Sequence, residues 1–135
     1  MSAAGVGGEL HELGIRMVAD FFEMDGWDSR YYGSNLPPVE LAKAIATDKP
    51  DLLCLSATMP WHVLDVQAAI GAVRSMPGMA QIPILAGGRP FVISPELWRG
   101  VGADGTAATA QDALELAGRL LRDLHDGKRA QTGRA

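Results

Sequence analysis

The chain has 135 residues, of which 47% are hydrophobic and 21% charged, and its formal net charge is -4 at pH 7. These values predict one domain with a buried core, and the acidic balance excludes the basic surface that direct nucleic-acid binding requires. The single cysteine excludes an internal disulfide and a thiolate-rich metal site. We expect a cytoplasmic protein outside the membrane, because no apolar run approaches the roughly 20 residues of a membrane span and the first residues do not resemble a signal peptide.

Five short segments have the composition of β-strands. Each stands between turn residues, and the segment around Leu53 is continuously apolar, as expected for the buried centre of a parallel sheet. The predicted strands are residues 2–6, 27–33, 50–58, 81–88 and 103–108.

Five helical patterns alternate with these strands. Ser94 and Thr109 stand where N-caps of the last two helices are expected. The predicted helices are residues 10–25, 39–48, 61–75, 94–101 and 110–125. In the first helix we expect the apolar face to consist of Leu10, Leu13, Met17, Val18, Phe21 and Phe22. The chain should form one domain over residues 1–125, followed by a flexible tail over 126–135.

This alternation predicts the α/β fold class, with a flavodoxin-like, Rossmann-type, doubly wound sheet of five parallel strands in the order 2-1-3-4-5. Ligands of such sheets bind beyond the carboxyl ends of the strands. In this chain those ends lead into four loops, near residues 7–14, 56–60, 87–90 and 107–110. A readable function should therefore lie in these loops.

Three functions common on this architecture do not fit the loops. A phosphoacceptor receiver domain needs an aspartate at the end of the third strand, where this chain has Leu55-Ser56-Ala57-Thr58. Glu9 in the first loop opposes the phosphate of a flavin. The same loop lacks the G-x-G-x-x-G pattern of a dinucleotide site.

His11 is the chemically distinctive residue of the first loop, because Glu9 precedes it by two positions. A carboxylate that accepts a hydrogen bond from one imidazole nitrogen leaves the other nitrogen for a metal. Zinc usually takes at least three protein ligands, so a single histidine suits a metal whose other ligands come from a macrocycle. Ser56, Thr58 and the pair Gly87-Gly88 suit an organic extension of such a cofactor.

Together, Glu9-x-His11-x-x-Gly14, Ser56-x-Thr58 and Gly87-Gly88 resemble the D/E-x-H-x-x-G, S-x-L/T and G-G signature of the cobalamin (vitamin B12)-binding domain family. The resemblance covers the chain from Ala3 to about Leu124. It implies adenosylcobalamin or methylcobalamin as the cofactor. His11 would be the lower axial ligand of cobalt, in place of the cofactor's own dimethylbenzimidazole (base-off/His-on).

The resemblance also implies roles for the other motif residues. Glu9 would orient His11, Gly14 would let the first helix begin beside the displaced nucleotide tail, and Ser56 would hydrogen-bond the benzimidazole. The implied cofactor-binding residues are Gly8, Glu9, Leu10, His11, Glu12, Gly14, Ser56, Thr58, Gly87, Gly88 and Ala108.

Domains of this family carry methyl groups, serve mutases or act as sensors. The loops hold no general acid–base pair or activated nucleophile, so we expect a cofactor module rather than a complete enzyme. Glu9 in place of the commoner aspartate favours a sensory or regulatory domain, such as a photoreceptor that controls transcription. The alternative is a corrinoid carrier protein or subunit of a B12-dependent methyltransferase. In either case we expect a partner protein or a further domain to cover the upper face of cobalt.

Overall fold

Four parallel strands form the central sheet of the computed structural model, which describes residues 1–6, 13–34 and 36–132. Their spatial order is β2-β1-β3-β4, which confirms the first four positions of the expected order. The third and fourth strands are in register from Leu53 opposite Ile84 to Ser56 opposite Gly87. The strands are β1 (Ser2–Gly5), β2 (Arg30–Tyr31), β3 (Leu53–Ser56) and β4 (Ile84–Gly87).

The expected fifth strand is reduced to one bridge. Gly105 pairs with Leu85 in parallel orientation, and the Ala86 amide donates to the Gly105 carbonyl at 3.1 Å. The chain therefore runs beside β4 at the expected position, but it forms no regular strand there. The reason is composition, because residues 103–108 consist mainly of alanine, aspartate and glycine, which disfavour extended structure.

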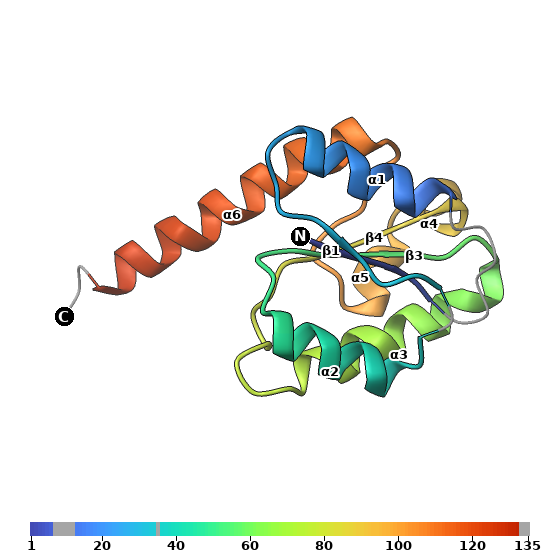
Figure 1. Cartoon of the computed structure of the whole chain (residues 1–135), viewed down its shortest axis with the longest axis horizontal. Helices are drawn as coiled ribbons and strands as arrows, with labels where there is room; N and C mark the ends of the chain where they lie inside the picture. Colours follow the sequence, from blue (N-terminus) through green and yellow to red (C-terminus); the bar gives the residue numbers. More distant parts are fainter. Residues whose placement is uncertain (7–12, 35, 133–135) are drawn as a thin grey trace.

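Helices cover both faces of the sheet, with α1 and α6 on one face and α2 and α3 on the other (Figure 1). Pro38 opens α2 because its missing amide and fixed φ suit the first helical turn. The helices are α1 (Leu13–Met24), α2 (Pro38–Asp48), the 3₁₀ turn η1 (Pro60–His62), α3 (Val63–Arg74), α4 (Arg89–Ile93), α5 (Leu97–Val101) and α6 (Ala110–Thr132). Among the described residues, no helix is both long and apolar enough to cross a bilayer.

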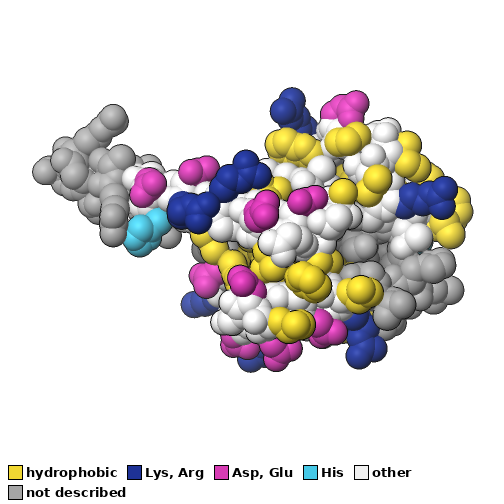
Figure 2. Space-filling view, turned by 90° about the horizontal axis from the view of Figure 1, so that it is seen from above, with side chains coloured by type: hydrophobic (Ala, Val, Ile, Leu, Met, Phe, Trp, Pro, Cys, Tyr) yellow, Lys and Arg dark blue, Asp and Glu magenta, His cyan; other side chains and the backbone are white. Residues whose placement is uncertain are grey.

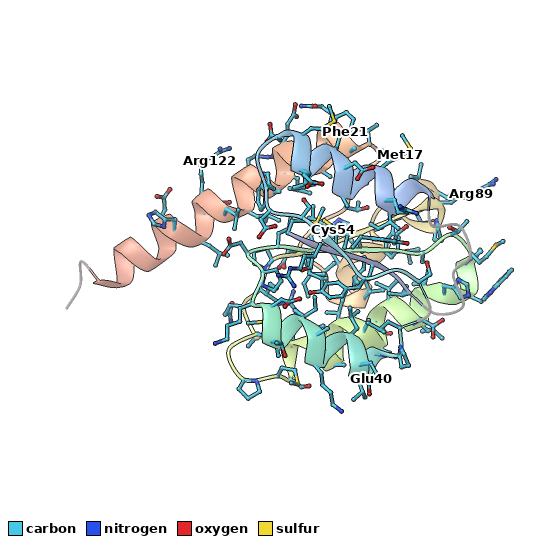
Figure 3. The ribbon with its side chains drawn as sticks, viewed as in Figure 1. Met17, Phe21, Glu40, Cys54, Arg89 and Arg122 are labelled. Carbon is cyan, nitrogen blue, oxygen red and sulfur yellow. The ribbon has the colours of Figure 1, made fainter. Side chains whose placement is uncertain are left out.

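The apolar face of α1 agrees with the expected one in part, because Phe22 is buried and Val18 packs against the core as predicted, whereas two other expected residues are exposed. The helix buries Ile15, Ala19 and Phe22, whereas Met17 is 55% exposed and Phe21 is 40% exposed. The Phe21 side chain points away from the sheet (Figure 3). The sequence contained two overlapping apolar stripes, and the stripe with the smaller Ala19 is the one that allows close packing on the strands.

The sequence prediction did not include one helix and placed one N-cap wrongly. Residues Arg89–Ile93 form α4, because Pro90 is tolerated in a first turn. Ser94 follows the end of α4 and does not cap the next helix, whose N-cap position is Glu96. In contrast, the Thr109 hydroxyl accepts a hydrogen bond from the Asp112 amide at 3.1 Å, which confirms the cap of α6.

Helix α6 continues to Thr132, past the boundary at residue 125 at which the sequence predicted a tail. Its first half lies beside α1, and its second half projects beyond the sheet (Figure 1). Figure 2 shows side chains of both charge signs along this projecting part. These charged side chains explain why α6 continues past residue 125, since a helix with a charged surface can continue in water without packing against the core.

Candidate functional site

A cavity of about 310 Å³ lies between the sheet and the α1–α6 layer. Its floor comes from β3 and β4, and its walls come from α1, from the start of α6 and from the segment that precedes α6. The lining residues are Ile15, Met17, Val18, Cys54, Leu55, Ser56, Leu85, Ala86, Gly87, Gly88, Ala107, Ala108, Thr109, Ala110 and Ala113. The cavity therefore opens at the carboxyl ends of β3 and β4, at the edge of the sheet where this architecture binds ligands.

Strand alternation explains the floor. Successive side chains of a strand point to opposite faces, so Cys54 and Ser56 of β3 share the face of the cavity. Leu85 and Gly87 of β4 do the same. Leu53, on the other side of β3, instead belongs to the core under α2 and α3. The side chains of β3 thus pack in the core under α2 and α3 on one face and line the cavity on the other.

Gly88 is a glycine because the fold requires it. Its φ is +106°, and a Cβ at this position would lie 1.9 Å from the Ala57 carbonyl oxygen. No side chain can occupy that space without a shift of the backbone. The close approach brings the loop after β4 against the residue that follows β3, and so it holds the mouth of the cavity in shape.

Gly87 is a glycine that the fold does not require. It has no positive φ, and a Cβ there would meet only the Ala107 carbonyl oxygen, at an ordinary 3.8 Å. That Cβ would point into the cavity, because Gly87 lines it from the same face of β4 as Leu85. The absence of a side chain at Gly87 therefore keeps the cavity open.

Cys54 lies in the floor, below α1 (Figure 3), and only 4% of it is exposed. Burial raises the pKa of its thiol to about 12, because the thiolate would lose its hydration. The thiol is therefore neutral at physiological pH and packs as a small apolar side chain. No charged side chain lines the cavity among the described residues.

The structure brings together four residues that the sequence assigned to cofactor binding. Ser56, Gly87, Gly88 and Ala108 come from three separate loops and line the same cavity. Thr58 follows β3 by two residues and is not part of this lining. Gly14 lies in the first turn of α1. The remaining assigned residues lie outside the described part of the chain: Gly8, Glu9, Leu10, His11 and Glu12.

The sequence analysis missed the apolar walls of the cavity. Ile15 and Val18 come from α1, Leu85 from β4, and Ala110 and Ala113 from α6. Two signals could have found them, namely the alternation along β4 and the small residues in the first turns of α6. Among the described residues, no group of three or more His, Cys, Asp or Glu side chains could hold a metal ion. The largely apolar lining of the cavity suits an organic group.

Comparison with known proteins relates this fold and site to cobalamin. The family model described as B12 binding domain matches residues 2–117. A corrinoid protein of Desulfitobacterium hafniense (strain Y51) is 25% identical over 117 residues, which make up 86% of this chain and 53% of that protein. The match therefore joins nearly the whole chain to about half of the relative.

Two solved structures share the fold. A cobalamin-binding protein from Desulfitobacterium hafniense DCB-2 superposes with a TM-score of 0.80 at 20% identity, over 88% of this chain and 57% of that one. The methanol:cobalamin methyltransferase complex MtaBC from Methanosarcina barkeri gives a TM-score of 0.78 at 18% identity, over 90% and 45% of the two chains. At these identities the likeness concerns architecture, and the chain spans about half the length of the proteins it matches.

Proposed function

Because this chain belongs to the B12-binding domain family, we propose that its cavity would hold the nucleotide tail of cobalamin and that His11 would be a ligand of the cobalt. The observation that carries this proposal is the convergence of Ser56, Gly87, Gly88 and Ala108 on one cavity. In particular, the fold would tolerate a side chain at Gly87, so the glycine there leaves open a space that packing does not require to be empty.

The cavity fits one part of this cofactor. A cavity of about 150 Å³ accommodates one benzene ring, so a volume of about 310 Å³ has room for a two-ring aromatic base. The corrin ring is far too large for this space, so only the tail can enter it. The apolar walls suit the faces of an aromatic base, and the Ser56 hydroxyl can hydrogen-bond its ring nitrogen.

Each residue of the site would have a separate role in binding the cofactor. Glu9 would hold His11 in the tautomer whose free nitrogen faces cobalt. Gly87 and Gly88 would let the tail pass close to the backbone, and Ala108, in the segment before α6, would close its far side. When bound, cobalamin supplies a cobalt ion that can carry a methyl group between two partners. The chain's residues bind and orient the cofactor and keep water from the tail.

We further propose that the module is a corrinoid carrier in methyl transfer. The relatives support this role better than the sensory role that Glu9 favoured, because they are described as corrinoid and cobalamin-binding proteins or as part of a methyltransferase complex. None of the relatives described above is a light sensor or a transcription regulator. A carrier needs a partner protein or a further domain at the upper face of cobalt, and methylcobalamin is its expected form.

Reconstitution tests cofactor binding and the axial ligand. The chain is mixed with methylcobalamin, freed of excess cofactor by gel filtration and examined by absorption spectroscopy. We expect a retained cofactor with a His-on spectrum that His11→Ala abolishes. His125→Ala, an exposed position on α6, is the matched control and should leave the spectrum unchanged. A chain that retains no cobalamin, or a His11→Ala spectrum identical to the original, would refute the corresponding assignment.

A second experiment separates the carrier from the sensor. The methylcobalamin-loaded chain is incubated in darkness with a thiol acceptor, and methylated thiol is measured. A parallel sample without thiol is illuminated with green light, and its spectrum and oligomeric state are followed. Methyl transfer with no lasting light response supports the carrier. A lasting light-driven change in spectrum and oligomeric state, without methyl transfer, would support the sensor instead.

A further inference from the structure

The side chains that line the cavity are poor in hydrogen-bonding groups. Of the fifteen described lining residues, Ser56 and Thr109 alone have a side-chain oxygen, and none has a charged or amide group. The Thr109 hydroxyl already accepts a hydrogen bond from the Asp112 amide at 3.1 Å. Ser56 is therefore the main polar side chain that the described lining offers to a ligand.

The inner end of the cavity is more apolar than its mouth. Cys54 lies two residues before Ser56 on β3, and Leu85 two residues before Gly87 on β4, so both lie farther from the carboxyl edge. Ile15 and Ala113 belong to the same buried cluster as these two residues. All four are at most 6% exposed, and a thiol is only a weak hydrogen-bond donor.

Three backbone carbonyls around the cavity are already engaged. The carbonyl of Gly87 accepts from the Ala57 amide at 3.1 Å, and that of Gly88 accepts from the Phe91 amide at 3.1 Å. The carbonyl of Thr109 accepts from the Ala113 amide at 3.0 Å. An amino group brought near these three carbonyls would therefore compete with the amides that already donate to them.

Cobamides differ in the base at the end of the nucleotide tail. A benzimidazole has one ring nitrogen free of the ribose, and the rest of its edge is apolar. A purine such as adenine has additional ring nitrogens and an exocyclic amino group. Each of these polar groups loses its water on entry, and burial without a partner is unfavourable.

From this contrast we infer that the cavity selects cobamides with a benzimidazole-type lower base over cobamides with a purine base. The inference rests on the proposed function and deepens it, because it names the class of cofactor that the same site accepts. The Ser56 hydroxyl serves the single free nitrogen of a benzimidazole, and the surface formed by Ile15, Cys54, Leu85 and Ala113 serves its apolar ring.

Equilibrium dialysis with three corrinoids tests this inference. The probes are cobalamin, a cobamide with adenine in place of dimethylbenzimidazole and the same upper ligand, and cobinamide, which lacks the nucleotide. We expect cobalamin to bind about ten-fold or more tightly than the adenine form, since at least one buried polar group of adenine would lack a partner. Equal or tighter binding of the adenine form, or equally tight binding of cobinamide, would overturn the selectivity while cobalamin binding stands. Failure of cobalamin itself to bind would instead refute the proposed function.

A variant locates the selectivity within the cavity. Cys54→Ser places a hydroxyl in the inner floor, where it can hydrogen-bond a purine, and should narrow the preference several-fold. The ratio of the two dissociation constants is measured, so a loss of stability that affects both ligands equally cancels. Ala42→Ser, in the packed core on the opposite face, is the matched control and should keep the original ratio. A ratio for Cys54→Ser equal to that of the control would contradict the placement of the base against Cys54.

Discussion

The two faces of this sheet differ in how completely their side chains are packed. Under α2 and α3, the sheet forms a core cluster of 19 buried apolar residues, and under α1 and α6 a cluster of 10 among the described residues. The second face also contains the cavity, lined at its mouth by Ser56 and Gly87. The face under α2 and α3 therefore stabilises the fold by close packing. That stability allows the face under α1 and α6 to contain a cavity.

Leu53→Ala should give the largest loss of stability. Leu53 is fully buried on the packed face, and its truncation should lower the free energy of unfolding by about 2–5 kcal/mol through lost burial and a residual cavity. Urea unfolding measures this change. Cobalamin affinity of the folded fraction should stay as in the original chain, so a specific loss of affinity would break the division between the two faces.

Gly88→Ala should act on stability and on the site together. The new Cβ would clash with the Ala57 carbonyl, and alanine disfavours a φ of +106°, so we expect a loss of about 2–4 kcal/mol. The same clash should distort the mouth of the cavity and weaken cobalamin binding. A variant as stable as the original in urea would show that the strand ends are not held this closely.

Stability should also fall in alkali because of Cys54. Its pKa is about 12 when buried and about 9.0 when exposed, so above pH 9 the unfolded chain loses a proton that the folded chain retains. The contribution is thus complete below pH 9 and is lost as the pH rises toward 12. The urea midpoint is measured between pH 8 and 10.5 for the original chain and for Cys54→Ala, whose decline should be shallower. Parallel declines would contradict the neutral, buried thiol.

Thr109→Ala should have a smaller effect on stability, limited to the face of the sheet under α1 and α6. It removes the hydroxyl that accepts from the Asp112 amide, which should lower the free energy of unfolding by about 1 kcal/mol. Thr109→Ser preserves the hydroxyl and should retain most of the stability. Equal losses in both variants would assign the effect to packing of the threonine methyl group and not to the cap.

The sequence predicted the features that depend on a repeated pattern of apolar residues or on a motif of particular residue types. Alternating apolar runs indicated the parallel sheet, and the motif residues Ser56, Gly87 and Gly88 indicated one edge of it, where they do line a common cavity. The roles of Glu9 and His11 remain predictions, since both lie outside the described residues.

Features that depend on tertiary packing could not be predicted in this way. Local spacing could not decide between Met17 and Ile15 as the buried side of α1, because both belong to apolar stripes and only the neighbouring strands select one. The same holds for residues 103–108, where the position beside β4 was correct but the pairing is limited to Gly105. The continuation of α6 past residue 125 could not be predicted from local composition either, because a helix with a charged surface can continue in water.

The most direct test of the account compares two Gly→Ala substitutions by equilibrium dialysis against cobalamin. Gly87→Ala places a methyl group in the cavity, whereas Gly71→Ala places it in open space on α3. Both variants should unfold in urea within about 0.5 kcal/mol of the original or slightly later, because alanine restricts the unfolded chain. We predict that Gly87→Ala weakens cobalamin binding by about ten-fold or more, a loss of about 1.4 kcal/mol, while Gly71→Ala leaves it unchanged. Unaltered affinity in Gly87→Ala would show that the nucleotide tail does not occupy this cavity.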